Sequence, residues 1–201
     1  MRAKCSQKFL KTFSASNFEK PKCVGRKMKE SVEVLNNRGI ALSESGNFLE
    51  AIACYKRAIT LEKENYVLYF NLGIVYQKQR NLRAAKAAME SALRLNCADE
   101  VFESLAIICL EQKKYSEATE YCQSGLEENP DNAHLWNTMG VIFFEQGEYE
   151  NAAETFERAV SINPYYYDAL FNLRDTYSEL GNARGETECQ ARLSALKERL
   201  N

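Results

Sequence analysis

The chain has 201 residues, of which 45% are hydrophobic and 27% charged, and only three are prolines. This composition is sufficient to bury a core in one or two domains. No apolar run approaches the ~20 residues of a membrane-spanning helix or the ~7–15-residue core of a secretory signal. We therefore expect a soluble, unsecreted, cytoplasmic protein, with organelle targeting by the N-terminal segment left open.

The first thirty residues carry a large positive charge. They contain nine basic and two acidic residues, a charge of +7, which leaves −9 for the remainder because the whole chain has a net charge of −2. Residues 1–31 lack the periodicity of the later sequence and are predicted to form a basic, flexible tail. Four roles remain open for this tail: a leader without a function of its own, an amphipathic organelle-targeting segment, a basic arm for nucleic acid or anionic membrane, or a peptide that docks on the protein itself.

From Val32 onward a helical spacing of apolar residues recurs in a unit of about 34 residues. The units are predicted at residues 32–65, 66–98, 99–132 and 133–166, with a degenerate fifth unit and a capping helix at 167–201. In the fourth unit, Gly147 can end a first helix with positive φ, and Pro164 cannot continue the second. The last helix has an apolar stripe formed by Cys189, Leu193, Leu196 and Leu200. It is interpreted as a solvating cap, with a partner-binding or dimerising helix as the alternative.

Small residues recur at two positions of the unit, where they would let paired helices approach closely while aromatic side chains fill the gaps. These residues are Gly39, Gly73, Ala106 and Gly140 in the first helix, and Ala51, Ala85, Ala118 and Ala152 in the second. One unit cannot bury its apolar face alone, but stacked units can. The pattern predicts an all-α solenoid of antiparallel helix pairs.

The four successive units resemble the tetratricopeptide repeat (TPR) family over most of the chain, and the fourth unit matches the family best, at seven positions. They are Trp136, Gly140, Phe143, Ala152, Phe156, Ala159 and Pro164. The resemblance implies a right-handed superhelical array that acts as a protein-interaction scaffold. This sequence departs from the family pattern at Arg38, at Arg80 and Lys113 in place of the turn glycine, and at Lys63 and Cys97 in place of the terminal proline. We therefore expect looser turns in the first three repeats.

Members of this family usually bind ligands along the concave face formed by the first helix of each pair. The resemblance implies a groove lined by Asn37, Ile40, Phe70, Asn71, Ile74, Glu100, Glu103, Ile107, Asn137, Val141, Phe144, Phe171 and Asn172. Acidic groups far outnumber Lys78 along this face, so the expected ligand is a basic or apolar-basic peptide or helix of another protein, with the aromatic residues as anchors.

Two patterns within this groove bear on the choice of ligand. Asn37, Asn71 and Asn172 are similar to the asparagine ladder with which some family members hold a peptide backbone, because an amide both donates and accepts. The alternative interpretation is that these asparagines only cap or space the helices and do not contact a ligand. The carboxylate clamp of chaperone-binding members is missing, since only Asn71 matches it. An acidic peptide tail is therefore an unsuitable ligand.

Nothing in the sequence has the pattern of a catalytic or metal-binding site. His134 is the one histidine, the seven cysteines form no CxxC pair, and no phosphate-binding glycine motif occurs. Cys109 and Cys122 lie on apolar helix faces as small hydrophobes, which is consistent with a reducing compartment. We therefore expect a non-catalytic scaffold without metal, cofactor or small-molecule substrate.

Three alternatives to simple peptide binding remain. The basic tail could dock into the groove in cis as a regulatory device, or could bind nucleic acid or an anionic membrane although the acidic body would repel phosphates. Self-association into a homo-oligomer is also left open.

Overall fold

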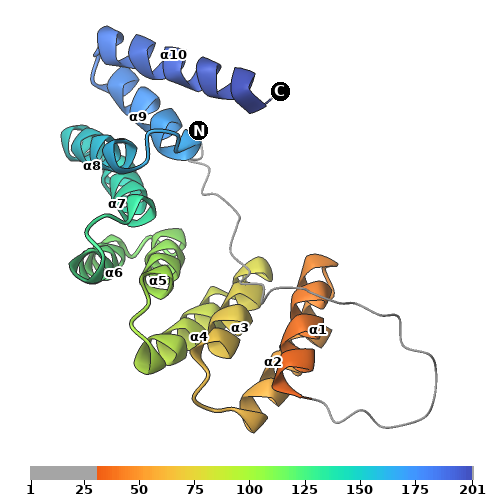
Figure 1. Cartoon of the computed structure of the whole chain (residues 1–201). Helices are drawn as coiled ribbons and strands as arrows, with labels where there is room; N and C mark the ends of the chain where they lie inside the picture. The colour runs from red at the N-terminus through yellow and green to blue at the C-terminus, as the bar shows by residue number, and fades with distance from the viewer. Residues whose placement is uncertain (1–30, 201) are drawn as a thin grey trace. The chain divides into compact units, whose positions relative to one another are not determined.

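The computed structural model describes residues 31–200, and every regular element in that range is an α-helix. The helices are α1 (Val32–Glu44), α2 (Phe48–Leu61), α3 (Tyr66–Lys78), α4 (Leu82–Leu95), α5 (Asp99–Glu111), α6 (Tyr115–Glu128), α7 (Ala133–Gln146), α8 (Tyr149–Ile162), α9 (Tyr167–Glu179) and α10 (Ala183–Leu200). They form two compact units (Figure 1). The N-terminal unit contains α1–α4 and ends at Asn96, and the C-terminal unit contains α5–α10 and begins at Cys97.

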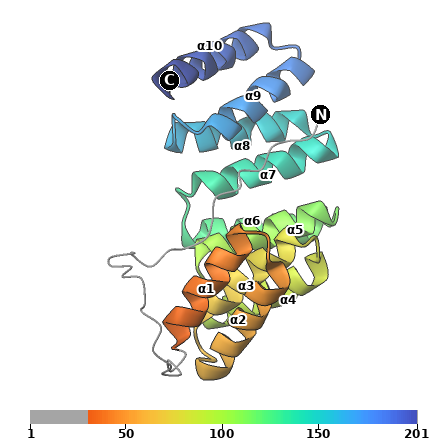
Figure 2. The same cartoon turned by 90° about the vertical axis from the view of Figure 1, so that its right-hand side faces the viewer.

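Each unit is a stack of antiparallel helix pairs, as Figure 2 shows for α7–α10. Consecutive helices pair as α1 with α2, α3 with α4, α5 with α6, α7 with α8 and α9 with α10. Within the units, the second helix of one pair packs on the first helix of the next. Stacking of this kind buries the apolar face that a single pair would expose. The predicted all-helical solenoid is therefore confirmed within each unit.

In the first, second and fourth pairs, the two helices meet where a glycine of the first helix faces a large residue of the second. A methyl group added to Gly39, Gly73 or Gly140 would lie 2.7, 2.8 and 2.6 Å from Tyr55, Met89 and Phe156, respectively. In the fifth pair the corresponding contact is polar, since Arg174 Nη1 donates a hydrogen bond of 3.1 Å to Gln190 Oε1. This close approach explains the recurrence of small residues in the sequence.

The turn inside each helix pair has the same geometry in all five pairs. Gly46, Arg80, Lys113, Gly147 and Gly181 have φ between 60° and 80°. After each of them, the next amide donates to the carbonyl five residues earlier, as from Asn81 to Tyr76 and from Lys114 to Cys109, both at 2.9 Å. This is the Schellman arrangement, which satisfies carbonyls left unpaired at a helix end. The expectation of looser turns at Arg80 and Lys113 was wrong, because these residues adopt the left-handed conformation that glycine usually provides.

Helix α10 covers the end of the C-terminal unit. Cys189 and Leu193 are 3% and 2% exposed and belong to the same core as Phe156 and Leu170, with Leu196 packed against them. Cys189, Leu193 and Leu196 of the apolar stripe are therefore packed within the C-terminal unit, whereas the side chain of Leu200 lies outside the described residues. Within residues 31–200, no helix is both long and apolar enough to cross a bilayer.

Candidate functional site

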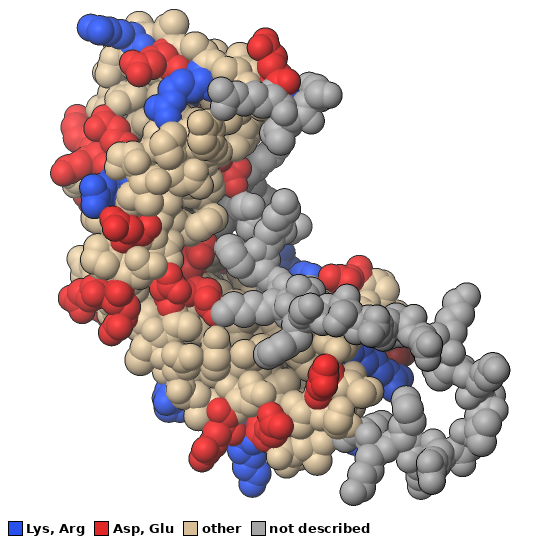
Figure 3. All heavy atoms as spheres, in the orientation of Figure 1, with Lys and Arg blue, Asp and Glu red and all other residues tan. Residues whose placement is uncertain are grey.

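The charges of the chain divide sharply between the two units. Residues 97–201 contain twenty acidic and eight basic residues, a net charge of −12, whereas residues 31–96 contain six acidic and nine basic residues, a net charge of +3. In Figure 3, acidic side chains dominate the charged surface over α5–α10, while both signs are mixed over α1–α4. The acidic character that the sequence indicates for the whole body thus belongs to the C-terminal unit.

The first helices of the C-terminal unit, α5, α7 and α9, carry acidic and apolar side chains at matching positions. We call this surface the acidic face. Residues spaced by three, four or seven share one side of a helix, and the acidic face accordingly comprises Glu100, Glu103 and Ile107 of α5, His134, Asn137, Val141 and Phe144 of α7, and Asp168, Phe171 and Asp175 of α9. Ile107, Val141, Phe144 and Phe171 are half-buried. Each of these four side chains therefore retains exposed apolar surface beside carboxylates.

Asparagines link neighbouring first helices in both units. Asn172 Nδ2 donates to Asn137 Oδ1 at 3.0 Å, which joins α9 to α7, and Asn71 Nδ2 donates to Asn36 Oδ1 at 3.0 Å, which joins α3 to α1. All four residues are buried, whereas Asn37 is exposed. The paired amides link adjacent repeats. Asn71, Asn137 and Asn172 are therefore buried between helices, whereas the residues of a peptide-binding asparagine ladder would be exposed.

The remaining predicted groove residues of the N-terminal unit are mostly internal. Ile40 and Phe70 are 6% and 1% exposed, and Ile74 is half-buried. Lys78 Nζ approaches Ser43 Oγ at 3.4 Å. Ile40, Phe70 and Ile74 therefore expose little apolar surface to a ligand.

A polar group of residues connects all three helices of the acidic face. His134 of α7 lies between Glu103 of α5 and Tyr166, which caps the start of α9. Tyr166 Oη is 2.8 Å from His134 Nδ1, and the same nitrogen lies 3.9 Å from Glu103 Oε1. The rings of His134 and Tyr166 have centroids 4.6 Å apart and are tilted by 54°.

The titration of these groups follows from their burial. Burial, with the charges of Asp99 and Glu100, raises the pKa of Glu103 from 4.5 to about 7. Burial also lowers the pKa of His134 below its ordinary value, against the opposing charges of Asp168 and Asp99. At neutral pH, His134 is therefore largely uncharged beside a carboxyl group that is partly protonated.

Asp99 has the opposite behaviour from Glu103, although it begins the same helix. Burial alone would raise the pKa of Asp99, but hydrogen bonds from the Asn129 and Asn132 side chains and from the Glu100 amide outweigh it and lower that pKa. The Asn129 and Asn132 amides approach Asp99 Oδ2 at 2.9 and 2.8 Å. Asp99 therefore remains ionised near Glu103.

Aromatic and cationic side chains surround Phe171 on α9. The ring of Tyr167 stacks on that of Phe171 with centroids 6.4 Å apart, and the guanidinium of Arg174 lies 4.2 Å from the Phe171 centroid. Arg174 also donates to Asp175 of the same helix. Phe171 is thus held in place by its neighbours while it stays half-buried.

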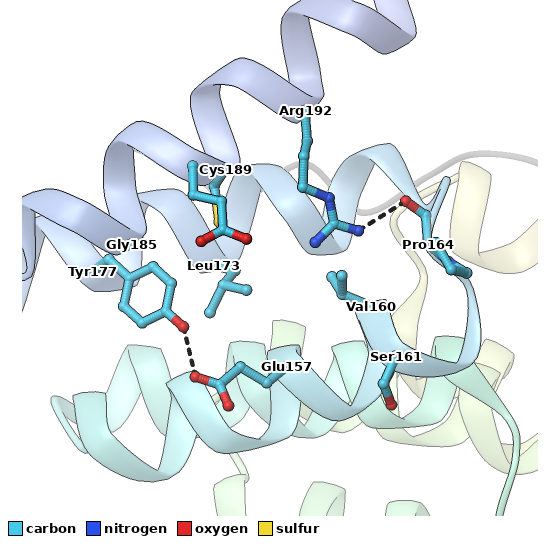
Figure 4. A pocket seen from close by; sticks show the side chains of 10 residues that line it. Glu157, Val160, Ser161, Pro164, Leu173, Tyr177, Gly185, Cys189 and Arg192 are labelled. Carbon is cyan, nitrogen blue, oxygen red and sulfur yellow. Dashed lines mark hydrogen bonds between the residues drawn. The ribbon is translucent and has the colours of Figure 1, made fainter.

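A separate cavity of about 420 Å³ lies between α8, α9 and α10 (Figure 4). The Tyr177 hydroxyl donates to Glu157 at 2.5 Å, and Arg192 donates to the Pro164 carbonyl at 3.1 Å. Burial and the neighbouring Glu157 raise the pKa of Tyr177. These polar groups are satisfied within the chain, so the cavity has the character of a packing space beside α10. Among residues 31–200, no cluster of three or more His, Cys, Asp and Glu residues is arranged to hold a metal ion.

Sequence reasoning identified Glu103 and His134 separately but missed Tyr166, which brings them into one group. Tyr166 is the N-cap residue of α9 in the structure, and the sequence shows it only as the middle of a run of three tyrosines after Pro164. The readings of residues 1–30, including Cys5 and Cys23, concern a part of the chain outside the described residues. Of the other cysteines, Cys54, Cys109, Cys122 and Cys189 are buried and Cys97 is exposed.

Comparison with known proteins gives consistent matches along the chain. Two family models described as tetratricopeptide repeat match residues 70–133 and 133–166, and one described as TPR repeat matches residues 39–79. BBSome complex member BBS4 of Bos taurus is 26% identical over 164 residues, which cover 82% of this chain and 30% of BBS4. Superkiller protein 3 of Saccharomyces cerevisiae is 22% identical over 168 residues, or 76% of this chain and 12% of that protein. The chain thus spans less than a third of the length of these relatives.

Solved structures with the same fold include the crystal structures of MamA and YrrB. MamA aligns with a TM-score of 0.69 at 20% identity, covering 86% of this chain and 94% of MamA. YrrB aligns with a TM-score of 0.62 at 22% identity, covering 86% of this chain and 89% of YrrB. From the repeated helix pairs, the small residues at their crossings and the three family matches, we conclude that the chain belongs to the tetratricopeptide repeat family.

Proposed function

We propose that this protein is a non-catalytic scaffold that binds a basic or apolar-basic segment of another protein on the acidic face of its C-terminal unit. The observation that carries this proposal is the combination on α5, α7 and α9 of carboxylates with half-buried Ile107, Val141, Phe144 and Phe171. Apolar anchors provide buried area, and surrounding charges select the partner and speed its approach.

Two of the similar proteins support an interaction role. The YrrB structure is described as a TPR protein with an unusual peptide-binding site, and BBS4 is named as a member of a complex. Both descriptions concern those proteins, and the shared repeat fold makes peptide or protein binding the natural proposal for this chain.

The sign of the charge favours a basic partner. The C-terminal unit has a net charge of −12, and such a surface attracts Lys- and Arg-rich segments while it repels phosphate backbones. Binding should therefore weaken as salt concentration rises. Apolar residues in the partner would retain part of the affinity at high salt because their contacts are not screened.

The test is a selection of random peptides displayed on phage against the immobilised full-length chain, followed by affinity measurements on synthetic peptides. We expect enriched peptides to combine Lys or Arg with apolar residues. Glu100→Lys should weaken their binding about tenfold, because a repulsive charge replaces an attractive one.

The matched control is Glu127→Lys, which changes the net charge equally at an exposed position of α6, the second helix of the same pair. It should leave affinity within about twofold, since it lies off the acidic face. If the two substitutions weaken binding equally, the peptide is attracted by the overall negative charge and not bound specifically on the acidic face. A failure to enrich any peptide would contradict the proposed function.

A second candidate is regulation by the chain's own N-terminal segment. Its charge of +7 complements the −12 of the C-terminal unit, and a tethered segment acts at an effective concentration on the order of millimolar. Replacement of the basic residues in 1–30 by glutamine in the full-length chain should then raise the affinity for a selected peptide. Unchanged affinity would exclude this regulation, and loss of binding to RNA, DNA or anionic vesicles would instead assign the segment to those ligands.

A further inference from the structure

The carboxyl group of Glu103 lacks a hydrogen-bond donor within residues 31–200. Glu103 is 7% exposed, and 10% of its side chain is accessible. His134 Nδ1 lies 3.9 Å from Glu103 Oε1, beyond hydrogen-bond length. Buried carboxyl groups in folded proteins are ordinarily paired with a cation or with hydrogen-bond donors. Glu103 therefore has unused acceptor capacity at the small part of its side chain that reaches the surface.

The residues around Glu103 do not supply this donor. Asp99 and Glu100 on its own helix are acidic, and Cys122 of α6 is a buried thiol whose pKa is raised by burial and by the charge of Glu103. On α7, His134 Nδ1 is engaged with Tyr166 Oη at 2.8 Å, and Asp168 of α9 adds a further negative charge beside His134. Because its pKa is lowered, His134 is largely neutral at pH 7 and does not balance Glu103.

We propose that Glu103 is the acceptor for a lysine or arginine side chain of the segment bound on the acidic face, with the His134 and Tyr166 rings lining the path of that side chain. This inference rests on the proposed function and names the chemical group that selects the partner. A cation is favoured over a neutral donor because three further carboxylates, those of Asp99, Glu100 and Asp168, surround the site. Aromatic rings also bind cations through their faces.

Proton linkage follows from this arrangement. The bound cation would stabilise the ionised carboxylate, so the pKa of Glu103 should fall from about 7 when a ligand binds. Below pH 7, a proton must leave Glu103 before the cation is bound. The affinity should therefore decrease as pH falls, with a limiting slope of about tenfold for each pH unit. Protonation of His134 at still lower pH adds a positive charge and reinforces the decrease.

The experiment is a double-mutant cycle on the full-length chain with peptides selected from the random library. Each Lys or Arg of a selected peptide is replaced in turn by norleucine or citrulline, which keep the length without the charge. We expect one position at which this replacement weakens binding tenfold or more to the wild type but less than about twofold to Glu103→Gln. Glu120→Gln, at an exposed position of α6 and therefore off the acidic face, serves as control and should preserve the effect.

Two further measurements separate a loss of the Glu103 contact from misfolding of the variant and from failure of the proposed function. Circular dichroism and thermal unfolding establish that Glu103→Gln is folded, and the carboxyl ¹³C shift of Glu103 reports its pKa with and without peptide. The inference is overturned if no position of the selected peptides is coupled to Glu103 and the Glu103 pKa does not change on binding. The Glu103 carboxyl group would then be hydrated, and the proposed peptide binding would still hold. If no peptide is enriched on the wild type, the proposed function fails and the inference fails with it.

Discussion

Lys113 and Arg80 have φ values of 60° and 62°, in the left-handed region that Gly46, Gly147 and Gly181 occupy at the same point of the other pairs. An L-residue with a β-carbon is strained there by about 1–2 kcal/mol, because the β-carbon crowds the following carbonyl. The Schellman hydrogen bonds and the stacked helices on either side hold these two residues in place. The turn is therefore imposed by the packing of the pair and not by the residue at its centre.

Lys113→Gly should raise the free energy of unfolding by up to about 1 kcal/mol, since glycine relieves the strain but loses more backbone entropy on folding. The measurement is the midpoint of urea unfolding. Gly147→Ala is the converse variant and should lower stability by about 1 kcal/mol through the backbone alone, because no atom beyond the adjoining residues lies within 4 Å of the added β-carbon. A destabilised Lys113→Gly would show that the lysine side chain outweighs the strain.

Tyr55 occupies the place in the first pair that Phe156 has in the fourth. Its ring packs on Gly39 with no exposed surface, and its hydroxyl is buried without a hydrogen-bond partner in the described residues. Tyr55→Phe should therefore stabilise the chain by about 1–2 kcal/mol, because an unsatisfied polar group leaves the core. Phe156→Tyr should destabilise it by a similar amount, and calorimetric melting of both variants checks the pair. A Tyr55→Phe variant that melts lower than the wild type would indicate an unrecognised partner for the hydroxyl.

Glu103 should make stability depend on pH in a defined window. Its pKa is raised from 4.5 to about 7 in the folded chain, so the folded state binds more protons than the unfolded state between these values, and stability falls as pH rises through them. Glu103→Gln removes this dependence. The variant should match the wild type near pH 4 and exceed it by on the order of 3 kcal/mol near pH 8. A stability difference that stays constant between pH 4 and pH 8 would contradict the raised pKa.

At the scale of the elements, the asparagine pairs are contacts between repeats and not within them. Asn137 and Asn172 lie on α7 and α9, and Asn36 and Asn71 lie on α1 and α3. Each pair places an amide–amide hydrogen bond where two first helices meet. A hydrogen bond of this kind fixes the register of one repeat on the next, since a shifted helix would bury both amides unpaired.

A double-mutant cycle on Asn137→Ala and Asn172→Ala should give a coupling of about 0.5–1.5 kcal/mol. Each single variant should cost more than half of the double variant, because it leaves the other amide buried without its partner. Chemical unfolding of the three variants provides the measurement, and Asn37→Ala, at an exposed position, is the neutral control. Strict additivity of the two substitutions would exclude a role for the pair in repeat stacking.

The sequence was sufficient to predict the helix pairs because apolar spacing and small residues are local signals. Gly140 and Ala152 recur at small-residue positions of the repeat, and the structure places Gly140 against Phe156 and buries Ala152. The partners of individual polar side chains were not predictable. Whether Asn71 faces a ligand or pairs with Asn36 depends on the rotation of one helix against another, which no single-helix pattern contains. The same limit explains why Tyr166 was missed beside His134.

At the scale of the whole molecule, the charge division changes the functional reading. The sequence indicates a body of charge −9, whereas the structure separates a unit of +3 from one of −12 at Asn96 and Cys97. No proline or glycine marks that boundary, so composition gave no reason to count the two parts separately. The proposed preference for a cationic partner therefore concerns the C-terminal unit and not the whole body of the chain.

This division also makes the protein a block polyampholyte whose small net charge conceals two large ones. Counted with the first thirty residues, the chain carries +10 before Cys97 and −12 after it. Near neutral pH we expect it to be retained on both cation- and anion-exchange resins. In dilute buffer, copies should attract one another through their opposite blocks, and added salt should disperse them because the Debye length shrinks to about 8 Å at physiological ionic strength. Light scattering across a salt series would follow this salting-in directly.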